Sequence, residues 1–132
     1  MTPEELIAAA AEARRNAHSP YSQYAVGCAL EAADGEVFRG CNVENISYGL
    51  TVCAERAAVF AAVCAGRRSW RALALVSEDG APPCGACLQV LAEFAGPDLA
   101  VYAATPDGRW QRWTLGDLLP SPFSSAEVGR SR

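Results

Sequence analysis

Strand-like and helix-like segments alternate along this chain, and the alternation indicates its fold class. Short apolar or alternating runs, two pairs of them joined by the Asp-Gly turns at 34–35 and 107–108, predict strands over residues 24–32, 36–41, 72–76, 99–104 and 109–114. Alanine-rich or periodic segments predict helices over 2–17, 51–66 and 84–96, with a short last helix over 114–119. This order favours an α/β fold in which helices cover a central mixed sheet.

Capping and helix-ending residues define the expected boundaries of the helices. Thr2 offers an N-cap with a proline beside it and Glu5 at the third helical position, and this first helix is expected to run to about Ala17. Thr51 is the expected cap of the second helix, and Gly66 is the residue that ends it. Helical spacing in that segment is shared by Cys53, Ala57, Phe60, Ala61 and Cys64. The tail from Ser121 is predicted to be irregular.

Size and charge narrow the class of protein. With 132 residues, 51% of them hydrophobic, the chain is predicted to form one domain over residues 1–132. It carries 11 basic and 15 acidic residues, a net charge of -4, which argues against a surface for a nucleic acid backbone. No apolar run reaches the roughly 20 residues of a membrane span, and the first residues lack the pattern of a signal peptide. We therefore expect a soluble, cytoplasmic protein with no nucleic acid or membrane partner.

The six cysteines are better explained by thiolate chemistry or metal ligation than by disulfides, because the expected compartment is reducing. Cys28, Cys41 and Cys64 lie among apolar neighbours and are expected to be small buried residues. Cys84 and Cys87 differ, because two thiols three residues apart at a helix start can hold one ion. The same pair also fits a redox site or half of a structural zinc site. The choice between these interpretations depends on which other residues could complete a metal site.

Cys53 is the candidate third ligand, because Glu55, a catalytic residue type, follows it at the start of the preceding helix. Three protein ligands leave the fourth position of a zinc ion open to water, whose pKa then falls toward neutrality. Glu55 would take the proton of that water, and Arg56 would donate hydrogen bonds to a ligand sulfur. A closed structural site remains the alternative, with Cys28, Cys41, Cys64 or His18 as the fourth ligand.

Cys53-Ala54-Glu55, followed by Pro83-Cys84-Gly85-Ala86-Cys87, is similar to the signature of zinc deaminases in its three-cysteine variant. Further short motifs stand in the order and spacing found in small homotetrameric zinc-dependent cytidine deaminases. They are Tyr21-Ser22, Val26-Gly27, Asn42-Val43-Glu44-Asn45, Ser47-Tyr48 and Leu118-Leu119-Pro120. The resemblance covers almost the whole chain.

This resemblance implies roles for individual residues. One zinc ion per chain would be held by Cys53, Cys84 and Cys87, with Glu55 as the proton shuttle and Arg56 beside the sulfur atoms. The implied substrate-binding residues are Asn42 and Glu44 at the ribose, Tyr24 near the nucleoside, and Tyr48 and Phe123 at a neighbouring subunit's site. The backbone N–H groups of Ala54 and Cys87, at the expected helix starts, are candidates to hold the pyrimidine oxygen or the hydroxide. The implied fold is a three-layer α-β-α sandwich with a five-stranded mixed sheet flanked by helices, assembled as a homotetramer.

Three positions depart from the family pattern. Tyr24 stands where the family usually has phenylalanine, which adds a hydroxyl that must be hydrogen-bonded or solvated. Leu88 replaces the arginine that commonly follows the second cysteine of the pair, so a positive charge near the thiolates is lost. Arg56 then becomes more important as a positive charge at the site. Pro82 stands where the family often has serine, a change that keeps the backbone carbonyl.

The predicted reaction is hydrolytic deamination of free cytidine or deoxycytidine to the uridine product and ammonia, a step of pyrimidine salvage. Deamination of a modified cytosine nucleoside such as blasticidin S is the enzymatic alternative, and a structural zinc module is the non-enzymatic one. A polynucleotide-editing deaminase would need a basic or aromatic strand-binding surface, which this acidic chain does not clearly show.

Overall fold

The structure, a computed structural model, describes residues 1–124. In chain order its elements are α1 (Pro3–Arg14), β1 (Gly27–Ala32), β2 (Val37–Cys41), the 3₁₀ helix η1 (Tyr48–Leu50), α2 (Ala54–Cys64), β3 (Trp70–Val76), α3 (Gly85–Phe94), β4 (Ala100–Ala104), β5 (Trp110–Thr114) and α4 (Leu115–Leu118). Every predicted strand and helix is present, and residues 121–124 form neither, as predicted. The rest of the predicted irregular tail lies outside the described residues. Within residues 1–124, no helix combines the length and the hydropathy needed to cross a membrane.

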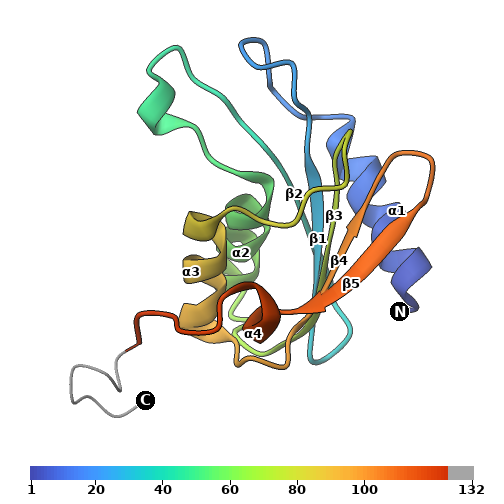
Figure 1. Cartoon of the computed structure of the whole chain (residues 1–132), viewed down its shortest axis with the longest axis vertical. Helices are drawn as coiled ribbons and strands as arrows, with labels where there is room; N and C mark the ends of the chain where they lie inside the picture. The colour runs from blue at the N-terminus through green and yellow to red at the C-terminus, as the bar shows by residue number, and fades with distance from the viewer. Residues whose placement is uncertain (125–132) are drawn as a thin grey trace.

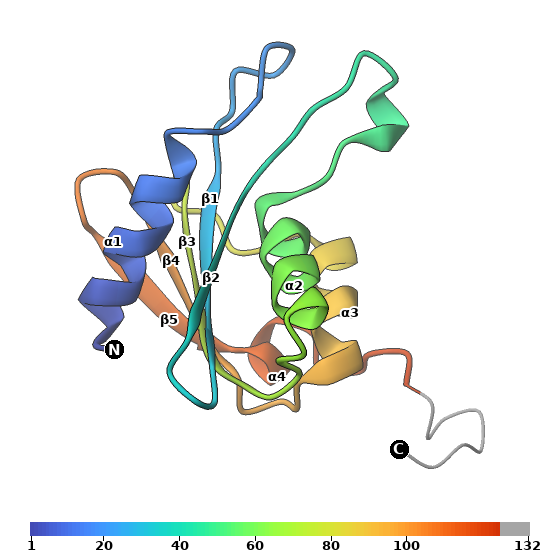
Figure 2. The ribbon, with the colours of Figure 1, turned by 180° about the vertical axis from the view of Figure 1, so that it is seen from behind.

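The five strands form one sheet in the order β2-β1-β3-β4-β5. β3 and β4 are parallel, whereas the other neighbouring pairs are antiparallel. Helix α1 covers one face of this mixed sheet, and α2 and α3 cover the other (Figures 1 and 2). The predicted three-layer α-β-α sandwich is therefore confirmed.

The sheet separates two hydrophobic cores because successive side chains of a strand point to opposite faces. On β3, Leu73 and Leu75 join the larger core beneath α2 and α3, while Ala72 and Ala74 face α1. Small residues let α1 approach the sheet closely: a Cβ added at Gly27 would lie 2.0 Å from the Ala10 carbonyl oxygen. A glycine is therefore required where α1 crosses β1.

Two helix ends differ from the sequence prediction. Helix α1 ends at Arg14, not near Ala17, because the chain leaves the helical ladder and the His18 N–H donates to the Asn42 carbonyl at 2.9 Å. Helix α2 is capped by Cys53 and not by Thr51, because Val52 pairs with Val43 in an isolated bridge and keeps the chain extended up to the cysteine. Both shifts result from contacts that the loop around Asn42 makes with distant segments.

The prediction for the isolated cysteines holds for one of three. Cys28 is fully buried, but Cys41 is half-buried and Cys64 is exposed. The side of α2 that reaches the core carries Ala54, Glu55, Ala58, Val59 and Ala62 and not the predicted periodic series. Periodicity does not select a face on a helix that is apolar on nearly all sides.

Candidate metal centre and substrate cavity

The candidate site lies at one end of the sheet. β1 runs antiparallel to both of its neighbours, so its beginning lies beside the ends of β2 and β3, with Gly27 paired to Cys41 and to Val76. Residues that precede β1 and residues that follow β2 and β3 therefore meet at this edge. Val26, Asn42 and Ser77 take these positions, and all three line one cavity.

Two helices begin at the same end of the sheet and supply the thiols. Cys53 and Cys84 are the N-caps of α2 and α3, and neither side chain is used in a capping hydrogen bond. Cys87 lies in the first turn of α3. The unpaired N–H groups and the dipole at a helix N-terminus favour the thiolate form of such cysteines.

The sulfur atoms of Cys53, Cys84 and Cys87 all lie within 4.8 Å of one another, and those of Cys84 and Cys87 are 3.4 Å apart. Tetrahedral zinc with Zn–S bonds of about 2.3 Å separates its sulfur ligands by roughly 3.8 Å, so the cluster fits this ion. Among residues 1–124 the group contains these three donors only. None of Cys28, Cys41, Cys64 or His18 belongs to it, which argues against the closed structural site.

Arg56 places a positive charge beside the sulfur cluster. Its Nη2 lies 3.4 Å from Cys53 Sγ and 3.4 Å from the Thr51 carbonyl oxygen, and its buried Nε has no hydrogen-bond partner among residues 1–124. Hydrogen bonds from the Cys87 thiol and from Arg56 lower the pKa of Cys53 to about 5. Leu88 is buried in the larger core and contributes no charge here.

Glu55 lines the same cavity from the first turn of α2 and is 5% exposed. Burial raises the pKa of its carboxyl to about 7. The carboxyl lies outside the cluster of sulfur donors, as expected for a residue that is not a ligand. A carboxyl group with a pKa close to neutral can both accept and release a proton under ordinary conditions.

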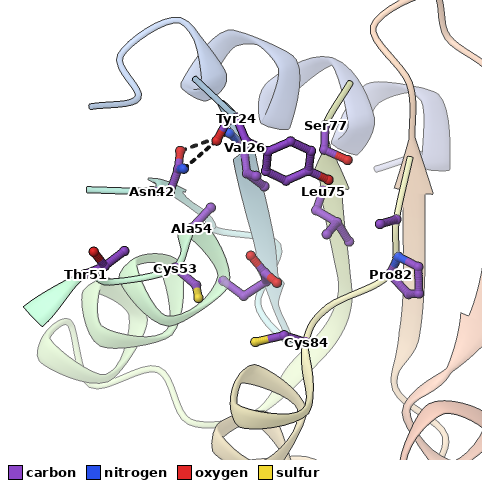
Figure 3. Close-up of a pocket in the computed structure, with 12 residues that line it drawn as sticks. Tyr24, Val26, Asn42, Thr51, Cys53, Ala54, Leu75, Ser77, Pro82 and Cys84 are labelled. Carbon is purple, nitrogen blue, oxygen red and sulfur yellow. Dashed lines mark hydrogen bonds between the residues drawn. The ribbon is translucent and has the colours of Figure 1, made fainter. Parts of the chain in front are cut away.

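The cavity has a volume of about 300 Å³. Tyr24, Val26 and Leu75 give it apolar walls, with Pro82 at its rim. Figure 3 shows the sulfur atoms of Cys53 and Cys84 on one side and the Tyr24 ring across from them. Of the substrate-binding residues expected from the sequence, Tyr24, Asn42 and Ala54 line this cavity.

Glu44 and Tyr48 line a second, adjoining cavity, and Thr51 borders both. The Glu44 carboxylate accepts hydrogen bonds from the backbone N–H groups of Tyr21 and Ser22, at 3.0 and 3.2 Å, and from the Ser22 hydroxyl. Phe123 lines neither cavity. Its backbone pairs with the Gln89 side chain of α3 through two hydrogen bonds, and its ring is exposed.

Ser77 and Asp79 are parts of the site region that the sequence prediction missed. Ser77 is 1% exposed, lines the cavity and donates a hydrogen bond to Asp79 at 3.2 Å. One signal was present in the sequence: Ser77 is the first polar residue after the apolar run of β3, and strand ends in α/β sheets are common ligand-binding positions.

The chain is similar in sequence and in fold to several cytidine deaminases. Residues 1–103 match the cytidine and deoxycytidylate deaminase zinc-binding region. The chain is 46% identical over 130 residues to the cytidine deaminase of Sporosarcina psychrophila, across 97% of this chain and 96% of that protein. A cytidine deaminase of Halalkalibacterium halodurans is also 46% identical, with 97% and 98% covered.

The crystal structure of a cytidine deaminase from Burkholderia pseudomallei superimposes with a TM-score of 0.89 and 50% identity, over 93% of this chain and all of that one. The zinc-binding region of these proteins spans the part of the chain that carries Cys53, Cys84 and Cys87, which identifies zinc as the cofactor. The match in sequence, in fold and in the cluster of sulfur donors leads to one conclusion: this chain belongs to the cytidine deaminase family.

Proposed function

We propose that this enzyme hydrolyses cytidine and deoxycytidine to uridine and deoxyuridine, with release of ammonia. The observation that carries the proposal is that Cys53 and Cys84, two of the three clustered sulfur donors, line one cavity together with the buried Glu55 carboxyl. Its volume of about 300 Å³ lies at the lower end of the range for small-molecule sites. A free nucleoside suits such a cavity, and the net charge of -4 does not favour a polynucleotide.

Cys53, Cys84 and Cys87 are the residues that would hold the zinc ion, with Arg56 keeping the Cys53 thiolate in place. When bound, zinc supplies a water molecule of lowered pKa as the nucleophile for C4 of cytosine. A carboxylate oxygen of Glu55 accepts the proton of that water and returns protons to N3 and the 4-amino group. C4 gains a C–O bond and loses its C–N bond, so cytidine and water become uridine and ammonia.

The walls of the cavity account for binding of the base. Tyr24, Val26 and Leu75 exclude water from a planar ring, and the Ala54 N–H at the start of α2 is assigned to the pyrimidine oxygen. Asn42 and Glu44 are assigned to the ribose hydroxyls. A fixed orientation of the Asn42 amide supports this assignment, because the amide donates to the Tyr24 carbonyl at 2.7 Å and accepts from the Val26 N–H at 2.9 Å.

We further propose that the chain, folded as a single domain over residues 1–132, assembles as a homotetramer in which Tyr48 and Phe123 reach a neighbouring subunit's site. Both rings are exposed in the isolated chain, and exposed aromatic residues are typical of interfaces. A cytoplasmic location is proposed because all six cysteines are free and the reaction needs thiolate ligands.

The test measures the ultraviolet absorbance change when purified protein of known zinc content is mixed with cytidine or deoxycytidine. Blasticidin S and a cytosine-containing single strand are run alongside. Rapid conversion of both free nucleosides at about one zinc per chain supports the proposal. Zinc-loaded protein that converts blasticidin S or the single strand, and leaves the free nucleosides unchanged, contradicts it.

A further inference from the structure

Tyr24 spans the gap between the two loops that flank the substrate cavity. The residue precedes β1, and its ring lines the cavity opposite the sulfur atoms (Figure 3). Its hydroxyl donates to Asp79 Oδ1 at 2.5 Å, in the loop that follows β3. The proton of the Tyr24 hydroxyl is therefore donated to the loop after β3 and not to the metal centre.

The Asp79 carboxylate accepts several hydrogen bonds in this loop. Besides the Tyr24 hydroxyl, its Oδ1 accepts from Ser77 Oγ at 3.2 Å and from the Ala81 N–H at 3.3 Å. The Ser77 hydroxyl also accepts from the Gly80 N–H at 3.1 Å. The same loop continues through Pro82, which lines the cavity, to Cys84. A bond to Asp79 thus connects the Tyr24 ring to the segment that carries a sulfur donor.

The other end of Tyr24 is held as well. Its carbonyl accepts from the Asn42 amide at 2.7 Å, and its N–H donates to Ser22 Oγ at 3.0 Å. Burial and the bond to Asp79 raise the pKa of the Tyr24 hydroxyl, while that same bond lowers the pKa of Asp79. Around neutral pH the Tyr24 hydroxyl is therefore protonated and the Asp79 carboxylate is ionised. A hydrogen bond to a charged acceptor is stronger than one between neutral groups.

We propose that the Tyr24–Asp79 hydrogen bond is a latch across the cavity mouth, with Tyr24 as a determinant of substrate affinity and Asp79 as the residue that positions it. This proposal rests on the proposed function. The latch holds the aromatic wall and the loop of 77–83 at a fixed separation, so the cavity is ready for a planar base before the substrate arrives. Preorganisation of this kind improves binding and leaves the chemical step unchanged.

The test compares Tyr24→Phe, Asp79→Ala and the double variant in steady-state kinetics with cytidine. Each single variant is expected to raise KM about fivefold, as for loss of one hydrogen bond at a partly exposed site, with kcat within about twofold of the parent. The double variant is expected to match Asp79→Ala, because removing the Tyr24 hydroxyl has no further effect once its acceptor is gone. Tyr24→Ala, which also removes the ring, is expected to raise KM further.

Tyr102→Phe is the matched control, since Tyr102 lies on the α1 side of the sheet and lines neither cavity. It is expected to leave KM unchanged. KM values within twofold of the parent in folded Tyr24→Phe and Asp79→Ala overturn the latch, as do effects that multiply in the double variant. A merely stabilising bond would lower the melting temperature and leave KM as it was, which also overturns it. If the parent converts neither nucleoside, the proposed function fails together with the latch, whereas an active parent with unchanged variants rejects the latch alone.

Discussion

At the scale of single residues, the site depends on groups of opposite character placed side by side. Three sulfur donors and one buried carboxyl would concentrate negative charge at the starts of α2 and α3, and the Arg56 guanidinium contacts one of them, Cys53 Sγ. Each of these groups has a separable task. In the proposed mechanism the ligands hold the ion, Glu55 moves protons and Arg56 supports a ligand, so each substitution predicts a different pattern of losses.

Glu55→Gln separates proton transfer from metal binding. Glutamine keeps the size of the side chain but does not take up the proton of water, so kcat is expected to fall roughly 10²- to 10⁴-fold. Zinc content and melting temperature are expected to stay close to those of the parent, because Glu55 lies outside the sulfur cluster. Kinetics and metal analysis on the same preparation check this. Glu4→Gln, on the exposed start of α1, is the control, and an active Glu55→Gln enzyme would reject the role of Glu55.

Cys84→Ala removes one of the three sulfur donors. Two remaining thiols bind zinc far more weakly, so zinc per chain is expected to fall well below the parent's value and activity with it. Metal analysis after dialysis is the measurement. Cys64→Ala is the matched control because that thiol is exposed at the far end of α2. Full zinc retention in Cys84→Ala would show that another residue holds the ion.

Arg56→Gln weakens support for a ligand without removing it. The guanidinium donates to Cys53 Sγ at 3.4 Å, and loss of such outer contacts typically lowers metal affinity about 10- to 100-fold. The expected result is faster transfer of zinc to a competing chelator, followed with a colorimetric dye. Arg68→Gln, on the exposed segment after α2, is expected to match the parent. Equal rates of zinc transfer from Arg56→Gln and Arg68→Gln would show that the contact between Arg56 and Cys53 does not support zinc binding.

At the scale of elements, local signals allowed most of the fold to be predicted. The Asp-Gly turns place Gly35 and Gly108 at φ of 92° and 93°, a conformation that glycine adopts without strain, so both hairpins could be located from sequence. The sulfur cluster was also predictable, because helix starts and Cys-x-x-Cys spacing are local. The Tyr24–Asp79 bond was not, since the partners are 55 residues apart and meet only through the pairing of β1 with β3.

Gly40→Ala tests how closely α2 packs on the sheet. A Cβ at Gly40 would lie 2.4 Å from the Ala54 carbonyl oxygen and 2.5 Å from the Ala58 N–H nitrogen, both rigid backbone atoms. Overpacking of this kind costs roughly 1–3 kcal/mol in the free energy of unfolding, and here it also displaces the helix that carries Glu55. Calorimetry is expected to show a lower melting temperature. Gly49→Ala, where an added Cβ meets nothing within 4 Å, is the control, and equal stability of the two variants would contradict the argument.

At the scale of the whole molecule, the isolated chain exposes several large apolar side chains on the loop around η1 and on α2. Ile46 is 80% exposed, Tyr48 73% and Leu50 66% in the loop around η1, and Phe60 on α2 is 49% exposed. This loop extends beyond the start of α2, on the side of the sheet away from α1 (Figures 1 and 2). Grouped apolar exposure of this kind supports the proposed contact between subunits. The same proposed contact would account for Phe60, a member of the predicted periodic series on α2 that does not face the core.

Phe60→Glu is the test of assembly. A charge in an apolar contact between subunits is costly to bury, so the variant is expected to dissociate while each chain keeps its fold. The parent is expected to sediment as a tetramer of about 56 kDa, four times the chain's 13.9 kDa, and the variant as smaller species. If Tyr48 and Phe123 complete a neighbouring site, the dissociated variant also loses activity at full zinc content, a combination that loss of fold does not produce.

Ala8→Glu, on the exposed side of α1, adds the same charge away from this surface and is expected to remain tetrameric and active. A parent that sediments as a fully active monomer would contradict the shared site and leave the zinc chemistry within one chain.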